Sequence, residues 1–156
     1  MKRSTKIALI TSGGDCQGLN AAIRGVGKSL FQRMDNVEIY GMYDGYRGLT
    51  EGGTILGTSR QNYVPGKDIV DDNGNSVIPS MLQTYNRLNL DCLVIMGGNG
   101  TQKSAKLIAD AGMNVITLPK TIDNDIWGTD TTFGFQSAVD IATNVIDYIH
   151  STASSH

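Results

Sequence analysis

Short apolar runs alternate along this chain with longer stretches in which apolar residues recur at helical spacing. Four of the apolar runs have strand length and are followed closely by Gly or Pro: residues 7–10, 37–40, 92–96 and 115–118. Helical patterns lie between them, at residues 20–33, 77–88 and 101–111. The last pattern ends at Gly112, as a helix C-cap would. The alternation predicts an α/β fold of three layers, α/β/α, with a Rossmann-like parallel sheet between helices.

Such a topology places the functional part of the sheet at one edge. Right-handed crossovers bring the loop after each parallel strand to the same edge. Ligands of open α/β sheets bind there, outside the carboxyl ends of the strands. The loops that follow residues 7–10, 92–96 and 115–118 are therefore the places to look for chemistry.

The end of the chain carries the clearest helical pattern. Its apolar residues fall on one stripe at i, i+3, i+4 and i+7 spacing: Phe135, Ala138, Val139, Ala142, Val145, Ile146 and Ile149. We interpret this stripe as core or interface rather than as chemistry. Residues 151–156 read as a polar tail, and clusters of Gly, Pro, Asp and Asn between residues 60 and 76 predict loops.

Composition narrows the class of protein. With 156 residues the chain can bury one core but is short for a two-lobed enzyme, so we treat residues 1–156 as one lobe. Lys and Arg number 13 against 15 Asp and Glu, which argues against a nucleic-acid partner. No signal peptide or membrane span is evident. Cys16 and Cys92 fit unpaired thiols in a reducing compartment, so we expect a cytoplasmic protein.

Two of the three expected loops are rich in glycine. Residues 11–15 include Gly13 and Gly14, which would let backbone N–H groups approach an anion, although plain packing is the alternative. Residues 97–101 lead straight into a helix whose N-terminal dipole favours negative charge. Here the alternative is that Thr101 only caps the helix. Both loops are candidates for binding phosphate.

The third loop, residues 119–125, carries charge. Asp123 and Asp125 lie two residues apart and repel each other unless a cation binds beside them, although solvated turn acids are the alternative. Lys120 and Thr121 precede them. Phosphoryl transfer requires backbone donors for phosphate oxygens, a carboxylate for magnesium, a base for the attacking hydroxyl and cations for the developing charge. The three loops together could supply these parts.

Several segments resemble phosphofructokinases: residues 7–25, 41–49, 53–60, 97–101 and 119–134. The most specific element is Thr121-Ile122-Asp123-Asn124-Asp125 followed by Gly128-Thr129-Asp130. The resemblance implies the glycolytic transfer of a phosphoryl group to the 1-hydroxyl of fructose 6-phosphate, with magnesium, in a homotetramer of two-lobed subunits. This chain would be the N-terminal, donor-binding lobe.

The resemblance also implies roles for individual residues. Asp123 would accept the proton from the sugar hydroxyl, with Thr121 and Asp125 beside it toward sugar and metal. Arg60 would supply positive charge at the transferring phosphoryl group, and Lys120 is a further candidate catalytic residue. The donor would contact six residues at matched positions: Gly14, Tyr46, Gly98, Asn99, Gly100 and Thr101.

The chain departs from the family pattern at three places. Asn99 stands where the metal-binding loop usually has Asp, so Asn99 and Asp125 would hold magnesium with one charge fewer. Lys120 resembles pyrophosphate-using members and members of the mixed-substrate ATP/pyrophosphate group, whereas Gly100 resembles ATP users. We favour ATP because Gly100 leaves room for an α-phosphate. The connection at residues 48–54 is shorter than usual.

One further expectation follows from the length of the chain. The segments that complete the fructose 6-phosphate site are missing, so we expect no appreciable turnover by these 156 residues alone. The alternatives are a pyrophosphate-dependent phosphofructokinase and a non-catalytic nucleotide-binding module.

Overall fold

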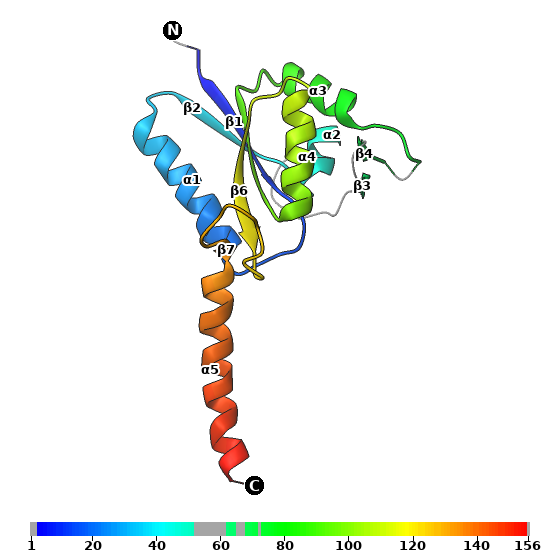
Figure 1. Ribbon diagram of the computed structural model, residues 1–156. Helices are drawn as coiled ribbons and strands as arrows, with labels where there is room; N and C mark the ends of the chain where they lie inside the picture. Colours follow the sequence, from blue (N-terminus) through cyan, green and yellow to red (C-terminus); the bar gives the residue numbers. More distant parts are fainter. Residues whose placement is uncertain (1–2, 52–61, 65–67, 72, 156) are drawn as a thin grey trace.

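A parallel β-sheet forms the centre of the computed structural model, which describes residues 3–51, 62–64, 68–71 and 73–155 (Figure 1). Its strand order is β2-β1-β5-β6-β7. The strands are β1 (Thr5–Thr11), β2 (Val37–Gly41), β5 (Cys92–Gly97), β6 (Val115–Thr121) and the short β7 (Phe133–Gly134). All four pairings between neighbours are parallel, which confirms the predicted fold class.

The order in which strands are added across the sheet reverses between β1 and β5. These two parallel strands pair with Ile7 opposite Cys92. From β1 the chain passes through α1 (Leu19–Arg33) to β2, and from β5 it passes through α4 (Asn99–Asp110) to β6 on the other side of β1. The two helices lie on opposite faces of the sheet (Figure 1). The loops after β1 and β5 therefore diverge, and this is where open α/β sheets bind ligands.

Alternate residues of β1 and β5 supply two separate cores, because successive side chains of a strand point to opposite faces. On one face, Ile7, Leu9 and Val94 of the sheet pack with Leu19 and Ala22 of α1. On the other face the buried side chains come from β1, β5, α4, α2 (Tyr46–Glu51) and α3 (Ile78–Arg87), and include Ala8, Ile10, Leu93, Ile95, Met81 and Ile108. These continuous apolar strands are what a sheet covered on both faces requires.

Several elements differ from the sequence-based expectation. The segment expected to hold only loops includes an antiparallel hairpin of β3 (Asn62–Val64) and β4 (Asp68–Val70). α2 and β7 were also not predicted, because both are short. Coverage of the α1 face is incomplete among the described residues, since Ile116 of β6 is 55% exposed.

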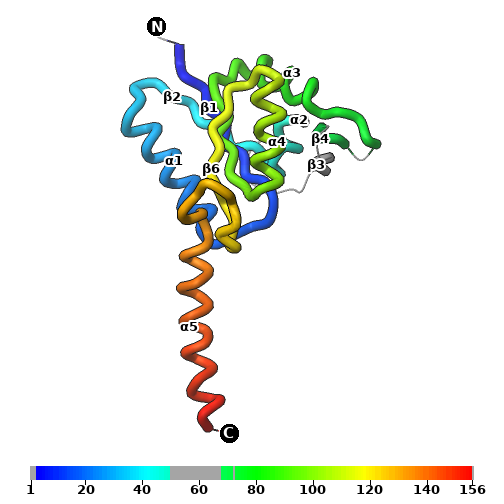
Figure 2. Tube along the Cα trace, viewed as in Figure 1, coloured from blue at the N-terminus to red at the C-terminus, as the bar shows by residue number. Residues whose placement is uncertain are grey.

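α5 (Phe135–Ser154) continues through most of the predicted polar tail, so this exposed polar segment is helical. Two hydroxyl groups bond back to the helix here: Ser151 Oγ donates to the carbonyl of Tyr148 at 3.1 Å, and Ser154 Oγ donates to that of His150 at 2.8 Å. α5 extends away from the rest of the molecule and buries no residue (Figure 2). Its apolar stripe is therefore not part of this core, which leaves the interface interpretation.

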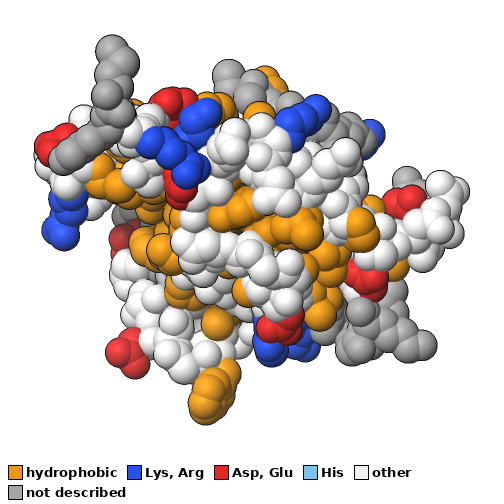
Figure 3. Space-filling view, turned by 90° about the horizontal axis from the view of Figure 1, so that it is seen from above, with side chains coloured by type: hydrophobic (Ala, Val, Ile, Leu, Met, Phe, Trp, Pro, Cys, Tyr) orange, Lys and Arg blue, Asp and Glu red, His pale blue; other side chains and the backbone are white. Residues whose placement is uncertain are grey.

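Seen from above, the molecule shows Lys, Arg, Asp and Glu side chains scattered with apolar ones between them, and no large basic patch (Figure 3). No helix in the described part of the chain combines the length and the apolar character needed to cross a bilayer.

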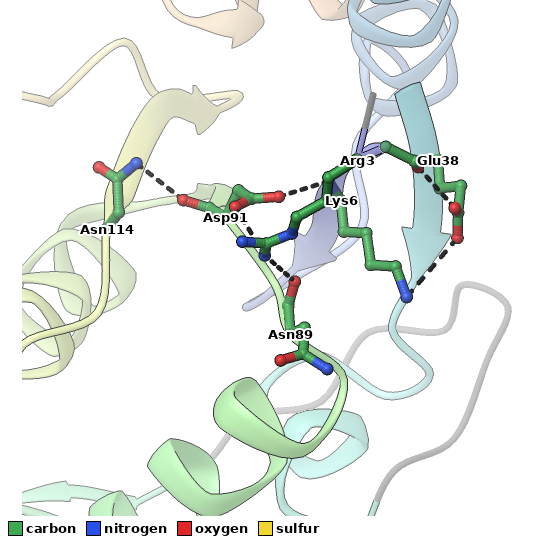
Figure 4. A network of polar contacts seen from close by, with 7 residues as sticks. Arg3, Lys6, Glu38, Asn89, Asp91 and Asn114 are labelled. Carbon is green, nitrogen blue, oxygen red and sulfur yellow. Dashed lines mark hydrogen bonds and ion pairs between the residues drawn. The ribbon is translucent and has the colours of Figure 1, made fainter. Parts of the chain in front are cut away.

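A polar network at the amino ends of the strands sets their register (Figure 4). The backbone N–H of Asp91 donates to the carbonyl of Lys6 at 2.7 Å, and the Lys6 N–H donates to the Asp91 carboxylate at 2.8 Å. Arg3 pairs with the same carboxylate at 3.1 Å, and Asn114 Nδ2 donates to the Asp91 carbonyl at 2.9 Å. Asp91 thus joins the beginnings of β1, β5 and β6.

We expect Asp91→Ala to lower the free energy of unfolding by about 1–3 kcal/mol, because the Lys6 N–H loses a charged acceptor. Arg3→Ala removes an exposed ion pair and an exposed hydrogen bond to the Asn89 carbonyl, and should cost no more than about 1 kcal/mol. Urea denaturation of both variants measures the difference. Equal losses in the two variants would show that the surface pair, and not the bond to the strand backbone, carries the effect.

Candidate functional site

The three loops expected at the carboxyl edge line a single pocket of about 530 Å³. The first loop follows β1, the second joins β5 to α4, and the third follows β6. The lining residues are Ser12, Gly13, Gly14, Asp15, Cys16, Tyr46, Gly98, Gly100, Thr101, Ser104, Lys120, Thr121, Ile122 and Asp123.

The first loop is held against the neighbouring strand. The Ser12 N–H donates to the carbonyl of Met96 in β5 at 2.9 Å. Gly13 then has a φ of +86°, a left-handed conformation that glycine adopts without strain. Asp15 Oδ1 accepts a hydrogen bond from the Cys16 N–H at 2.9 Å. The glycine pair therefore turns the chain sharply while leaving its backbone open to the pocket.

The second loop needs glycine for a different reason. A Cβ atom on Gly97 would lie only 2.3 Å from Thr101 Oγ1, so only glycine permits this close approach. α4 begins at Asn99 with Gly98 as its N-cap, two residues before the predicted start. The interpretation of Thr101 as a cap is therefore wrong, because Thr101 lies within the first turn. The first N–H groups of the helix lack intrahelical acceptors and, with the helix dipole, favour an anion.

The third loop is shaped by its own side chains. The Asp123 N–H donates to Thr121 Oγ1 at 3.1 Å. Asn124 has a φ of +52°, and its Oδ1 accepts from the Thr132 N–H at 2.9 Å. Thr132 Oγ1 donates to the Thr121 carbonyl at 2.7 Å. These bonds fix a turn in which Asp123 lines the pocket.

Lys120 connects the third loop to the first. Its side chain is buried, with the residue only 4% exposed, and its Nζ donates to the Gly14 carbonyl. No carboxylate among the described residues forms an ion pair with it. A buried ammonium group without a counter-charge is costly. An anion in the pocket would relieve this cost.

Three buried hydroxyl groups also border the pocket. Ser12, Thr101 and Ser104 are 4%, 6% and 4% exposed. None of the three side chains has a hydrogen-bond partner in the part of the chain that the structure describes. Buried polar groups are normally paired, and leaving one unpaired costs about 1–3 kcal/mol. The pocket is therefore built for a polar ligand.

Tyr46 closes one wall of the pocket. Its residue is 2% exposed, and its hydroxyl donates to the Thr101 carbonyl at 3.0 Å. Burial raises the pKa of Tyr46, so the phenol stays protonated and keeps this bond. Tyr46 thus fixes the first turn of α4 from the side of α2.

The two candidate metal ligands meet just beside the pocket. Asn99 Nδ2 lies 3.4 Å from Asp125 Oδ2 and 3.2 Å from the Asp125 carbonyl oxygen. Both residues are exposed, and neither lines the pocket. Nowhere in the described ranges do three or more His, Cys, Asp or Glu side chains form a group that could hold a metal. Any ion here would take most of its ligands from phosphate and water.

The structure therefore brings together most of the candidate residues. Eight of them line one pocket: Gly14, Tyr46, Gly98, Gly100, Thr101, Lys120, Thr121 and Asp123. Asn99 and Asp125 contact each other at the same edge. Arg60 lies outside the described residues. Sequence reasoning did not select Ser104, although its place three residues after Thr101, on the same helix face, was a usable signal.

These features define a class of protein: a parallel α/β lobe with a phosphate-type pocket at the point where the strand order reverses. The phosphofructokinase family model matches residues 6–156, and the chain belongs to this family.

Named relatives agree with this assignment. An ATP-dependent 6-phosphofructokinase of Spirochaeta thermophila is 51% identical over 177 residues, covering 100% of this chain and 48% of its own length. ATP-dependent 6-phosphofructokinase 3 of Bacteroides thetaiotaomicron is 46% identical, with 97% and 49% covered. The chain spans about half the length of the curated relatives it matches.

Solved structures show the same fold. Phosphofructokinase from Saccharomyces cerevisiae superposes with a TM-score of 0.77 at 27% identity, covering 98% of this chain and 25% of that one. A pyrophosphate-dependent phosphofructokinase from Marinobacter aquaeolei gives a TM-score of 0.62 at 19% identity, covering 84% and 37%. The second likeness shows the fold alone.

The two thiols should differ in reactivity. Cys92 is 8% exposed, and burial raises the pKa of its thiol, so less reactive thiolate is present at a given pH. Cys16 is half-buried and lines the pocket. We expect iodoacetamide at pH 8 to label Cys16 in the native protein and Cys92 only after denaturation, as measured by peptide mass spectrometry. Native labelling of Cys92 at the rate of Cys16 would contradict the packing of β5.

Proposed function

We propose that residues 1–156 form the donor-binding lobe of an ATP-dependent 6-phosphofructokinase, which transfers a phosphoryl group from ATP to the 1-hydroxyl of fructose 6-phosphate. The observation that carries this proposal is the single pocket in which two glycine-rich loops face the loop bearing Asp123. Phosphoryl transfer depends on positioning and charge stabilisation, and these are what the three loops can offer.

Asp123 is the proposed general base. Its residue is exposed at the pocket, so a sugar hydroxyl can approach its carboxylate. The bond from its N–H to Thr121 Oγ1 limits the movement of the turn. Thr121 and Asp125 lie on either side of it and are the proposed neighbours of sugar and metal. A carboxylate in this position accepts the proton as the hydroxyl attacks phosphorus.

The donor phosphates are placed between the first two loops. Gly14, Gly98, Gly100 and Thr101 line the pocket there, and the free N–H groups at the start of α4 can donate to phosphate oxygens. Tyr46 supports this helix turn from behind. Anion binding at this point would also offset the buried charge of Lys120.

The oxygen atoms of Asn99 and Asp125 fit a magnesium ion, because magnesium prefers hard oxygen ligands and keeps several waters. A rotation of the Asn99 amide would direct its oxygen instead of Nδ2 toward Asp125. When bound with the donor, magnesium would neutralise charge on the phosphate oxygens. With one carboxylate in place of two, the protein itself contributes weak affinity.

Lys120 is the feature that favours a second candidate, a pyrophosphate-dependent enzyme. Its Nζ lies beside the first loop and could reach a phosphate in place of the Gly14 carbonyl. We favour ATP because relatives that are 51% and 49% identical to this chain are named ATP-dependent, and because Gly100 adds no side chain to the pocket. Arg60 is proposed as a second cation on the basis of its family position alone.

The chain spans about half the length of the relatives it matches, and the proposed acceptor site would draw on residues outside these 156. We therefore propose that the 156 residues alone have no appreciable turnover, and that the whole enzyme is a homo-oligomer. Fructose 1,6-bisphosphate formation by the purified 156-residue chain would contradict the first statement.

The central test uses the longest natural polypeptide that carries this sequence. We expect Asp123→Asn to lower kcat by about 10²- to 10⁴-fold, because the base is lost while the shape is kept. Asp110→Asn is the matched control and should leave kcat unchanged, because it removes an exposed carboxylate whose one ion-pair partner among the described residues is Lys106. Product formation from fructose 6-phosphate is measured with ATP and, separately, with pyrophosphate.

Two outcomes would count against the proposal. An Asp123→Asn enzyme that retains full activity would remove Asp123 from the chemistry. A wild-type enzyme with higher kcat/KM for pyrophosphate than for ATP would establish the second candidate instead.

The metal ligands give a separate prediction. Asn99→Asp adds a second carboxylate beside Asp125, so the magnesium concentration for half-maximal activity should fall several-fold. Titrating magnesium into EDTA-treated enzyme at fixed ATP measures this concentration. Asn86→Asp, at an exposed position of α3 that does not line the pocket, is the control. An unchanged magnesium requirement in Asn99→Asp would exclude residue 99 from the metal site.

A further inference from the structure

Ser104 lies on the pocket wall one helical turn beyond the proposed phosphate end. It lines the pocket, is 4% exposed and has no side-chain partner in the described ranges. A helical serine often donates to the carbonyl four residues before it, but no such bond to Gly100 is present. The hydroxyl is therefore available to a ligand.

The position of Ser104 along α4 separates it from the phosphate-binding groups. Ser104 is the sixth residue after the N-cap Gly98. At 1.5 Å per residue, the two are separated by about 9 Å along the helix axis. Only the first N–H groups of the helix are free to bind phosphate. At Ser104 the backbone N–H is used within the helix, so the side chain alone offers a polar atom there.

The chemistry at this point suits a neutral polar group. No Lys or Arg among the pocket-lining residues lies on α4, and the one lining ammonium group, that of Lys120, bonds to the first loop. The Tyr46 hydroxyl already donates to the Thr101 carbonyl. A single hydroxyl can satisfy one hydrogen bond of a sugar or a base but does little for a charged phosphate.

We propose that Ser104 is a donor-specificity residue whose hydroxyl hydrogen-bonds to the nucleoside part of a nucleoside triphosphate. Inorganic pyrophosphate held at the start of α4 ends at its second phosphorus and leaves Ser104 unpaired. A nucleotide continues through its ribose and base along the pocket wall. This inference rests on the proposed donor pocket, and it explains how that pocket distinguishes ATP from pyrophosphate.

The test measures binding rather than turnover. Isothermal titration of the longest natural polypeptide with ATP, tripolyphosphate and pyrophosphate, in magnesium buffer without fructose 6-phosphate, gives a Kd for each. We expect Ser104→Ala to weaken ATP binding about three- to tenfold, the effect of one lost hydrogen bond. Tripolyphosphate, which has similar charge but no nucleoside, should bind both forms within about twofold of each other.

Ser29→Ala is the matched control, since Ser29 lies inside α1 and does not line the pocket. Thermal denaturation checks that Ser104→Ala is folded. Unchanged ATP affinity in Ser104→Ala would overturn the inference, and so would equal weakening of ATP and tripolyphosphate, which would indicate a general loss of pocket structure.

The two proposals can fail separately. Wild-type protein that binds pyrophosphate but not ATP overturns the role of Ser104 and leaves phosphoryl transfer standing. Wild-type protein that binds ATP and is weakened selectively by Ser104→Ala, yet forms no sugar bisphosphate, supports Ser104 and overturns the proposed reaction.

Discussion

The parallel pairing of β1 with β5 is the constraint on which the rest of this structure depends. The two strands lie side by side, but the helices that follow them cover opposite faces of the sheet. Their outgoing loops must therefore separate, and the space between them is the pocket. The Asp91–Lys6 bonds fix this pairing at the amino edge, so the geometry of the site is set at the end of the sheet farthest from it.

Unpaired polarity is what distinguishes this pocket from an ordinary gap between loops. Lys120 places a buried positive charge against a backbone carbonyl, and three buried hydroxyls lack partners among the described residues. A core that only had to be stable would pair these groups or replace them with apolar ones. A polar, anionic ligand in the pocket would offset this energetic cost. The same groups therefore favour binding at the expense of the stability of the empty lobe.

The exposed face of α5 shows the complementary feature. Val145, Ile146 and Ile149 lie on a helix that buries no residue of its own. Ile116 on the open face of β6 is likewise exposed. Both surfaces are apolar and exposed, because no described residue packs over them. The lobe therefore has its buried unpaired polar groups at the pocket and its exposed apolar side chains on α5 and β6.

Local patterning in the sequence determined the strands and helices and the three loops at one edge, because apolar periodicity and glycine placement act over a few residues. It also selected Asp123, Lys120 and Gly14 through the residues around them. It missed β7, α2 and the β3–β4 hairpin, which are short and form by pairing or packing rather than by periodicity. It also did not show that α5 continues into the polar tail. Only the tertiary structure decided that Lys120 reaches Gly14, that Asn99 meets Asp125, and that Ser104 is buried without a partner. Those facts depend on contacts between residues distant in the chain or on burial, and no local pattern encodes them.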